Sequence, residues 1–521
     1  MGRILTSAIL SILAVPLTFA QGDQGFGQGR PPGSGGGQRP TITSTTEAAP
    51  AAKNASIDVP TSITKHSIKL PSGDLSYTAT AAQIPLRKDS GEVECKMFYV
   101  AYTRDGADIS SRPVTFAFNG GPGSATMWLH MGSLGPKRAP MPDDGSLPKP
   151  PYSVMDNPDT WLDFTDVVVI DAPGTGYSRI ARPDLGTKFF GVTQDIAAFT
   201  DFVRNWLKEH HRWSSPIFIA GESYGGIRGS GLSASLVRAG IGVNGFISIS
   251  GTNSYMTIRG LRGNDSPYVG FFPTMAACAW YHKKLDKRFR TVEQVVKESQ
   301  EWIDKEYASV LERGDSLSDQ EKDRVAQKMS EFLGISKKYC LGANLKVNEG
   351  AFMRELLREE GLQIGRYDGR LVGKEENRVG ERGAGDPSDE ATTPPFTTAI
   401  NDYLDRELGI KTDLRYLNSG NVRPWAETEG TYSETASDLS RLLLRNKHFR
   451  VLYCGGYYDM ACPINATIFT VNHMGLDKET RSHISYAYYP AGHMMYIEKM
   501  SRQKFHDDVA EFVKATLNGT N

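Results

Sequence analysis

The sequence predicts an α/β protein with a mostly parallel central sheet and helices on both faces. Strand-like apolar runs alternate with helix-like segments over residues 114–250, and strands resume at about residue 450. Because parallel strands need helical crossovers, this alternation favours a sheet that is buried on both faces. Glycine-containing loops at 119–123, 171–178 and 221–226 each follow a predicted strand. Ligands of such sheets bind at the carboxyl ends of the strands, so these loops mark the candidate site.

The chain begins with a segment that is typical of a secretory signal. Arg3 precedes an apolar run, and Thr18-Phe19-Ala20 offers a small-x-small cleavage site. We therefore predict a signal peptide at 1–20 and transport to the exterior or to a vacuolar or lysosome-like compartment. Residues 21–58 are rich in Gly, Gln, Pro, Ser and Thr, which predicts a disordered segment or pro-segment before a catalytic domain at 59–521.

The composition argues against several classes of partner. The 521 residues carry a formal charge of −1 without a long basic run, so nucleic acid is not expected as a partner. No apolar tail closes the sequence, so we expect no stable membrane anchor. We expect neither a metal nor another cofactor, and the sequence indicates no oligomeric state. Four glycosylation sequons agree with secretory passage, at Asn54, Asn264, Asn465 and Asn518.

The individual elements follow from hydrophobic periodicity. An antiparallel entry to the sheet is expected first, because alternating strands come directly after one another. The predicted strands are 75–81, 93–103, 114–118, 167–170, 217–220, 246–250, 450–454 and 484–489. The predicted helices between them are 193–211 and 227–237, and a terminal helix buries Phe505, Val509, Phe512 and Val513.

The pattern changes between about 252 and 446, where we predict a helical cap insertion. Segment 366–393 is charged and Gly-rich and is predicted to be a loop. The chain has five cysteines, so a secreted form has at least one unpaired thiol, and Cys278 and Cys340 are candidates for a bridge. The amphipathic helices expected in this insertion are 292–311, 322–333 and 352–360.

A G-x-S-x-G sequence at 221–225 lies between a predicted strand and a predicted helix. This is the context of a nucleophile elbow, whose serine has a strained backbone and needs glycine neighbours to avoid clashes. Ser223 is the only serine with glycine two residues away on both sides. A Gly-rich turn with an exposed serine is the structural alternative, so the other parts of a hydrolytic site must decide.

A serine nucleophile needs a base and a carboxylate that orients this base. In the α/β-hydrolase order, the acid and then the histidine follow the serine along the chain. Asp459 follows the strand at 450–454, and His493 follows the last predicted strand. Both positions are at carboxyl ends of strands, as Ser223 is.

Other residues compete for these roles. Asp477 is the rival acid but lies between a helix and a turn, and Asp459 itself could cap a helix that begins near Ile464. His483 starts a strand at the wrong end of the sheet, and His506 lies in the terminal helix. An oxyanion hole further needs two backbone N–H donors. The residue after the nucleophile, Tyr224, supplies one, and Gly121 in the early glycine loop is our choice for the second.

Four loops together resemble the serine carboxypeptidases. The resemblance covers residue 64 to the C-terminus and is strongest in Asn119-Gly120-Gly121-Pro122-Gly123, Asp171-Ala172-Pro173-Gly174-Thr175-Gly176-Tyr177-Ser178, Gly221-Glu222-Ser223-Tyr224-Gly225-Gly226 and Gly492-His493-Met494. It implies an α/β-hydrolase fold and the release of single amino acids from peptide C-termini, usually at acidic pH. The triad that it implies is Ser223, His493 and Asp459, with Gly121 and Tyr224 at the oxyanion hole.

The resemblance also implies a site for the terminal carboxylate of the substrate, formed by Asn119, Glu222 and the Gly120 N–H. Glu222 beside a second carboxylate cannot ionise cheaply, so one proton is shared between them and the contact needs acidic pH. A buried structural acid is the alternative for Glu222.

The sequence departs from the family pattern at several positions and is expected to belong to an outlying branch. Ser124 replaces the cysteine that commonly follows the glycine loop, Arg228 replaces a tyrosine, and Ala172 replaces a glutamine. Cys462 falls where many members keep a free thiol near the substrate pocket, and a bridge to Cys454 is its alternative. These departures affect the expected side-chain preference more than the triad.

Peptide cleavage is therefore the predicted function, with peptide C-termini as the substrate. An acyltransferase or esterase with the same triad is the first alternative, and a non-catalytic secreted binding protein is the second. Asn119 and Glu222 favour a peptide carboxylate over an ester. Binding proteins on this scaffold typically lose the serine or histidine, and both are present.

Overall fold

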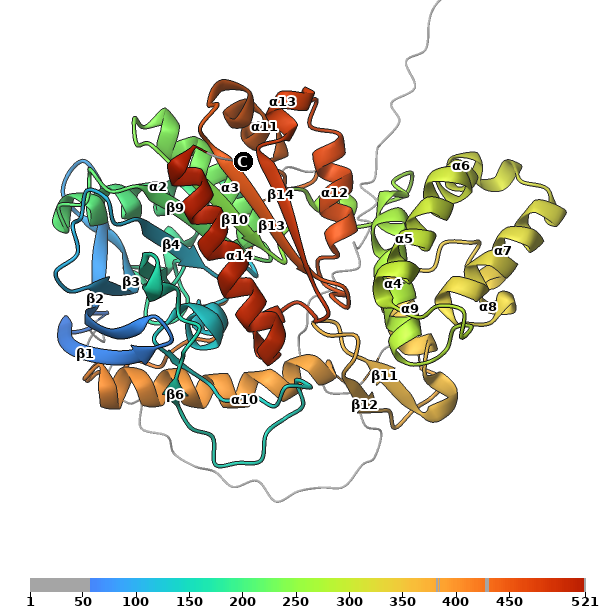
Figure 1. The fold of residues 1–521 in the computed structure, drawn as a ribbon, viewed down its shortest axis with the longest axis horizontal. Helices are drawn as coiled ribbons and strands as arrows, with labels where there is room; N and C mark the ends of the chain where they lie inside the picture. The colour runs from blue at the N-terminus through green and yellow to red at the C-terminus, as the bar shows by residue number, and fades with distance from the viewer. Residues whose placement is uncertain (1–56, 381–382, 384, 427–430, 520–521) are drawn as a thin grey trace, which may run out of the picture. The chain divides into compact units, whose positions relative to one another are not determined.

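The computed structural model describes residues 57–380, 383, 385–426 and 431–519. Its central sheet has ten strands in these residues, in the order β1-β2-β3-β7-β4-β9-β10-β13-β14, with β8 paired to β3 (Figure 1). The strands are β1 Ser62–Leu70, β2 Gly73–Arg87, β3 Val93–Arg104, β4 Val114–Phe118, β7 Asp166–Ile170, β8 Arg179–Ile180, β9 Ile217–Glu222, β10 Gly245–Ile249, β13 Arg450–Gly456 and β14 Ile484–Tyr489.

The first three strands form an antiparallel entry, and β7, β4, β9, β10, β13 and β14 run parallel to one another. The α/β-hydrolase fold and the antiparallel entry are both confirmed. Register explains where the site must lie. Phe118 pairs with Gly221, Glu222 with Ile249, and Ile249 with Cys454. The loops after β4, β9, β10 and β13 therefore leave one edge of the sheet together.

Alternate residues of β9 enter two separate cores. Phe218 and Ala220 face a core that includes the buried side of α14, Lys499–Asn518, whereas Ile217 and Ile219 face a core with α2, Val192–Glu209, and α3, Gly225–Arg238. Figure 1 shows α14 in front of the strands and α2 and α3 behind them. Helices therefore cover both faces, as the alternation of strands and helices in the sequence predicted. Phe512 is only partly buried.

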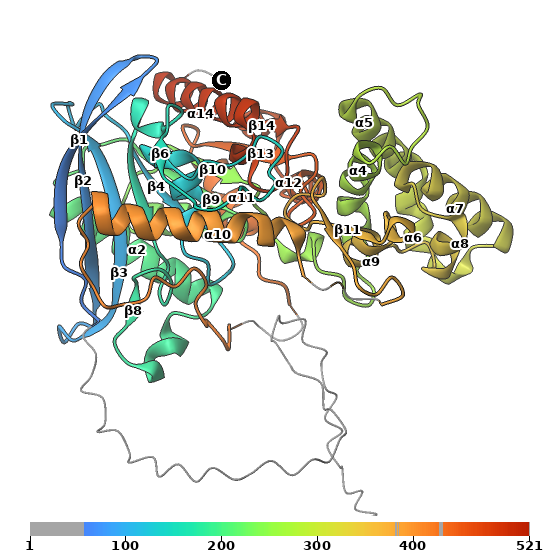
Figure 2. The ribbon, with the colours of Figure 1, turned by 90° about the horizontal axis from the view of Figure 1, so that it is seen from below.

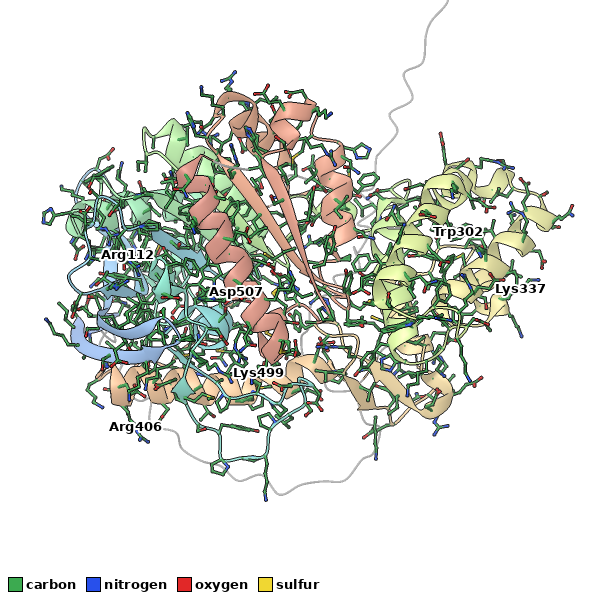
Figure 3. All side chains as sticks on the ribbon, viewed as in Figure 1. Arg112, Trp302, Lys337, Arg406, Lys499 and Asp507 are labelled. Atoms are coloured by element: carbon green, nitrogen blue, oxygen red, sulfur yellow. The ribbon has the colours of Figure 1, made fainter. Side chains whose placement is uncertain are left out.

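The predicted insertion divides into parts that pack differently. Its first helices have a core of their own around aromatic residues such as Phe272, Phe332 and Trp302, which is labelled in Figure 3. The elements of this first part of the insertion, not all of which enter that core, are η4 Tyr255–Thr257, α4 Ser266–Tyr281, α5 Val292–Trp302, η5 Ile303–Tyr307, α6 Ala308–Arg313, η6 Gly314–Ser316, α7 Asp319–Leu333, α8 Lys337–Gly342, α9 Glu349–Glu355 and η7 Arg358–Glu360. Tyr458 and Met460, which flank Asp459, belong to the same core. The insertion thus supports the loop after β13.

The later insertion joins the main body instead. α10, Pro387–Asp402, contributes Phe396, Ala399 and Ile400 to the core that α14 covers, and α11, Ala436–Arg445, joins the opposite core. Figures 1 and 2 both show α10 extending from the β11–β12 hairpin, Leu362–Ile364 and Val372–Lys374, towards β1.

The loop that we predicted for 366–393 is wrong in part, because it contains β12 and the first turns of α10. Asp386 caps α10 and Pro387 opens it, which is a favourable start for a helix. Pro394 and Pro395 lie inside this helix, although proline ordinarily disfavours a helix interior.

The remaining elements are short or connect the others. They are α1 Met127–Leu129, η1 His130–Leu134, β5 Lys137–Arg138, β6 Met155–Asp156, η2 Trp161–Asp163, η3 Pro183–Lys188, η8 Tyr403–Glu407, α12 Ile464–Asn472, α13 Lys478–Arg481 and η9 Met495–Ile497. Arg112, labelled in Figure 3, and Arg212 share the buried Asp166 carboxylate at the start of β7, which holds the loop ends opposite the site.

The ends of the chain and the cysteines bear on earlier predictions. The signal peptide predicted at 1–20 lies outside the described residues. The disordered segment or pro-segment predicted at 21–58 also lies outside the described residues, except for Ile57, whose carbonyl accepts a hydrogen bond from Gln83, and Asp58, which pairs with Lys96. All five cysteines are buried and free. The suggested Cys278–Cys340 bridge is therefore wrong, since each thiol packs within the insertion without a partner sulfur.

Candidate active site

Ser223 lies at a sharp turn between β9 and α3. Its φ is 63°, a left-handed conformation that is strained for serine. A Cβ on Gly221 would lie 2.2 Å from the Gly225 carbonyl oxygen, so a side chain does not fit there. The Ser223 N–H donates to the Ile249 carbonyl at 3.1 Å, which ties the turn to the end of β10. The strand, turn and helix predicted for 217–237 are confirmed.

His493 and Asp459 form a buried pair beside this turn. Nδ1 of His493 lies 2.8 Å from Oδ2 of Asp459, and both side chains are almost inaccessible to solvent. The other oxygen, Oδ1, accepts the N–H groups of Ala461 and Cys462 at 2.8 and 2.9 Å. Burial lowers the pKa of His493, but the charge and hydrogen bond of Asp459 outweigh this effect and leave the pKa above its ordinary value. An imidazolium is therefore stabilised at this position.

The loop of His493 is held from two sides. Its N–H donates to the Tyr367 carbonyl at 2.6 Å, and the Ser250 hydroxyl donates to the His493 carbonyl at 2.7 Å. The Tyr367 ring lies 5.3 Å from the imidazole ring, measured between centroids. The β11–β12 hairpin and the end of β10 thus fix the backbone that carries the imidazole.

Cys462 connects the serine to the acidic loop. Its sulfur lies 3.9 Å from Oγ of Ser223, and its N–H binds Asp459. Burial raises the pKa of this thiol to about 12, so it is neutral at ordinary pH. Cys462 is free, as predicted, and the alternative bridge to Cys454 is wrong.

The glycine loop after β4 lies directly against the elbow. A Cβ on Gly120 would lie 2.5 Å from the Tyr224 nitrogen, and Gly121 has a φ of 104°. Tyr224 precedes the first turn of α3, where backbone N–H groups have no partner inside the helix. Gly121 and Tyr224 therefore come from neighbouring loops, in the arrangement that an oxyanion hole requires.

Glu222 and Asn119 also meet at this edge. Asn119 Nδ2 donates to Glu222 Oε1, and the Tyr496 hydroxyl donates to Oε2, each at 2.7 Å. The Leu129 N–H in turn donates to Asn119 Oδ1 at 3.0 Å, which orients the amide. Burial raises the pKa of Glu222 to about 7, although both donors and His493 oppose this shift. The carboxyl group is therefore largely protonated at acidic pH.

A buried ion pair lies beneath the elbow. Arg228 Nε donates to Asp195 at 2.8 Å, its NH1 group donates to the Asn119 carbonyl at 2.6 Å, and the Tyr224 hydroxyl donates to Asp195 at 3.0 Å. The guanidinium also lies 4.5 Å from the centre of the Phe199 ring. Arg228, which stands where the family pattern has tyrosine, thus links the loops of Asn119 and Tyr224.

The structure brings together all eight residues predicted for the site and adds several that the sequence did not reveal. Tyr496, Tyr367, Ser250 and Asp195 hold predicted residues in place. Tyr496 lies three positions after His493, and this closeness in sequence is the only feature that could have indicated its place in the site. The others contact the site through long-range pairings that no motif marks.

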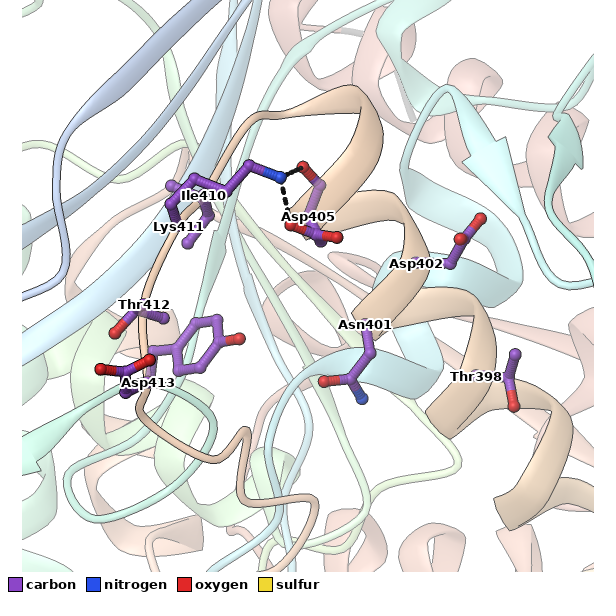
Figure 4. Close-up of a pocket in the computed structure, with 9 residues that line it drawn as sticks. Thr398, Asn401, Asp402, Asp405, Ile410, Lys411, Thr412 and Asp413 are labelled. Carbon is purple, nitrogen blue, oxygen red and sulfur yellow. Dashed lines mark hydrogen bonds and ion pairs between the residues drawn. The ribbon is translucent and has the colours of Figure 1, made fainter.

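A separate open pocket of about 760 Å³ lies between the end of α10 and the following loop (Figure 4). Asp402, Asp405, Lys411 and Asp413 line it together with Tyr177, and Lys411 pairs with Asp405. None of the candidate active-site residues lines this pocket. Within the described part of the chain, no group of three or more His, Cys, Asp or Glu side chains is arranged to hold a metal ion.

A model of the family described as "Serine carboxypeptidase" matches residues 86–506. The chain belongs to this family. The match spans β4, the elbow, the acidic loop and the histidine loop, which are the segments that form the site. The earlier resemblance is therefore confirmed.

Among curated proteins of the serine carboxypeptidase type, the chain is similar to serine-type carboxypeptidase F of Aspergillus niger. The two are 26% identical over 187 residues, which cover 31% of this chain and 32% of that protein. It is also 26% identical over 155 residues to serine carboxypeptidase-like 36 of Arabidopsis thaliana, covering 29% of each. The chain thus aligns with less than a third of the length of these relatives.

A solved structure supports the fold. Kex1(delta)p, a prohormone-processing carboxypeptidase from Saccharomyces cerevisiae, matches with a TM-score of 0.51 at 15% identity. The match covers 84% of this chain and 91% of that one. At this identity the likeness concerns the fold. Of the helices in the described residues, none is long and apolar enough to cross a membrane.

Proposed function

We propose that this protein is a serine carboxypeptidase that releases C-terminal amino acids from peptides through an acyl-enzyme, with highest activity at acidic pH. One observation carries the proposal: the Asp459–His493 pair and the strained Ser223 lie directly beside the buried Glu222–Asn119 pair. The first group fits acyl transfer, and the second fits recognition of a free carboxyl end.

In the proposed reaction, Ser223 Oγ attacks the carbonyl carbon of the last peptide bond. The serine proton moves to Nε2 of His493, while Asp459 holds Nδ1 and stabilises the imidazolium. The N–H groups of Gly121 and Tyr224 stabilise the oxyanion. The imidazolium then protonates the leaving amine, so the C-terminal amino acid departs and an ester on Ser223 remains. Water, deprotonated by His493, hydrolyses this ester.

Glu222 accounts for the choice of a chain end. When it is protonated, its carboxyl group donates a hydrogen bond to the terminal carboxylate of the substrate, to which Asn119 Nδ2 and the Gly120 N–H also donate. When it is ionised, two carboxylates face each other in a buried site, and binding is opposed. A pKa of about 7 for Glu222 thus makes peptide binding stronger at acidic pH.

The substrates that fit this site are the C-termini of peptides and proteins. The family and the leader-like sequence at 1–20 support secretion or delivery to a vacuolar compartment. An esterase or acyltransferase would use the same serine but would not need the proton on Glu222.

Replacing the nucleophile tests the proposal. Ser223→Ala should lower kcat for peptide hydrolysis by a factor on the order of 10⁴ or more, because no acyl-enzyme forms. Ser235→Ala, in the helix that follows the turn and about 15 Å along its axis from Gly225, serves as the control. The measurement is steady-state peptide hydrolysis, with circular dichroism to check folding. Normal turnover in a folded Ser223→Ala protein would remove Ser223 from the mechanism.

A further inference from the structure

Arg366 is an exposed cation in the hairpin that supports the histidine loop. It follows β11, and its N–H donates to Asp386 Oδ1 at 3.0 Å, which fixes its backbone. The next residue, Tyr367, accepts the His493 N–H. A Cβ on Gly492 would lie 2.4 Å from the Tyr367 carbonyl oxygen, so the two loops are in close contact.

The guanidinium group of Arg366 lies close to the candidate base. Its central carbon is 5.2 Å from the centre of the Tyr367 ring, and that ring is 5.3 Å from the His493 ring. The cation and the imidazole therefore both lie next to the Tyr367 ring. Arg366 also acts electrostatically on Cys462, whose sulfur lies 3.9 Å from the Ser223 hydroxyl.

Within the described part of the chain, Arg366 differs from its neighbours in forming no ion pair. Arg354 pairs with Glu375, Arg358 with Glu355 and Arg370 with Asp368. Among the described residues, no carboxylate forms such a pair with the side chain of Arg366. An exposed guanidinium at a reaction site is thus available for a carboxylate from outside the protein.

Four of the described acidic side chains lie near this cation, but none of them forms an ion pair with it. Asp386 Oδ1 is bound by the backbone and hydroxyl of Ser388, and Asp459 is bound to His493. Asp389 accepts a hydrogen bond from Thr393, and burial raises the pKa values of Asp389 and Glu349. The arginine keeps its charge at acidic pH.

The position of Arg366 relative to Ser223 indicates which substrate residue it meets. Asn119 and Tyr496 surround Glu222, where the C-terminal carboxylate is proposed to bind. Arg366 lies instead against the Tyr367 ring, in the hairpin that holds the histidine loop. Because the terminal carboxylate is proposed to bind at Glu222, we assign the Arg366 side to the penultimate residue, whose carbonyl carbon is attacked.

We propose that Arg366 determines specificity and favours peptides with Asp or Glu at the penultimate position. This inference rests on the proposed carboxypeptidase function. The planar guanidinium matches a carboxylate through paired N–H donors, which an aliphatic or amide side chain does not reproduce.

The test compares N-blocked dipeptides that end in leucine and carry Glu, Gln or Lys before it. At about pH 6, where a glutamate side chain is ionised, kcat/KM for Glu should exceed that for Gln by about fivefold to tenfold, the size of one partly exposed charge contact. Arg366→Gln should abolish this preference, measured as the ratio of kcat/KM for the Glu and Gln substrates, while the variant still hydrolyses the Gln substrate. Arg366→Lys should keep most of it, and Arg366→Glu should reverse it in favour of Lys. Lys374→Gln removes an exposed cation from the same hairpin and should change nothing.

Each outcome decides a separate question. If wild-type protein releases leucine from the Gln substrate but Arg366→Gln keeps the same preference for Glu, the role of Arg366 is wrong. A preference that follows Asp or Glu at the C-terminal position instead also overturns it. If wild-type protein releases leucine from none of the substrates, the proposed function itself fails.

Discussion

Glu222 lies between two donors, and in the proposed function its proton decides whether the terminal carboxylate of a substrate binds. Asn119 and Tyr496 bind its two oxygens, while burial favours the neutral form. The neutral acid can donate to a substrate carboxylate, whereas the ionised acid repels it. Because Tyr496 and Asn119 also stabilise the ionised form, the pKa is raised only to about 7.

Glu222→Gln should therefore flatten the pH dependence of peptide cleavage. In the wild type, kcat/KM for peptides should fall as pH rises through about 7, because Glu222 loses its proton. Glutamine donates a hydrogen bond at every pH, so this fall should disappear in the variant. Ester substrates without a free carboxylate should respond little to the substitution. Rates on peptide and ester substrates, measured across pH, check this; parallel changes in both would exclude a carboxylate-binding role.

Single residues show what the sequence could and could not predict at the site. The positions of Ser223, Asp459 and His493 at one edge of the sheet were predictable because their order and their places after strands carry the signal. Tyr496 and Arg228 hold predicted residues through contacts that depend on the folded chain, so sequence spacing alone could not assign their partners. The same applies to Cys278, whose surroundings decided that it remains a free thiol.

At the scale of elements, the elbow depends on the close approach of two loops. Gly120 after β4 leaves no room for a side chain against the first amides of α3. Strand positions here were predictable because buried parallel strands are continuous apolar runs. The helix α10 was not, because Pro394 and Pro395 favour a break locally while its packed face stabilises the helix in the fold.

Gly120→Ala should damage the site through this contact. The added Cβ would lie 2.5 Å from the Tyr224 nitrogen, so either the glycine loop or the elbow must shift. We expect kcat to fall at least about 100-fold, as when an oxyanion donor is misplaced. Gly242→Ala, where the added Cβ meets nothing within 4 Å, is the matched control. Steady-state kinetics of both variants provides the measurement, and equal activities would refute the importance of the contact.

Folding buries several acidic side chains and raises their pKa values. Besides Glu222, burial raises the pKa of Asp171 to about 6, although Thr126 and Tyr416 donate to it. An acid with a raised pKa in the folded state favours folding at low pH. This contribution is complete below the pKa of the unfolded chain and is lost as pH rises through the folded value. The buried acids therefore favour a fold that works at acidic pH.

Glu222→Gln should make the free energy of unfolding less dependent on pH. The pKa of Glu222 rises from 4.5 to about 7 on folding. In the wild type this shift lowers the free energy of unfolding by up to about 3 kcal/mol as pH rises between these two pKa values. Relative to wild type, the variant should become more stable by that amount as pH rises from about 4.5 to 7.5. Urea unfolding at both pH values measures the change, and an identical pH dependence in both proteins would contradict the buried, raised-pKa state.

The central claim is that this chain removes residues one at a time from free carboxyl ends. Incubation with a mixed peptide library at several pH values, followed by mass analysis, tests it most directly. We expect products shortened by single C-terminal residues, faster at acidic pH, with no such products from C-terminally amidated peptides or from Ser223→Ala protein. Internal cleavage, or equal hydrolysis of amidated and free peptides, would contradict the claim.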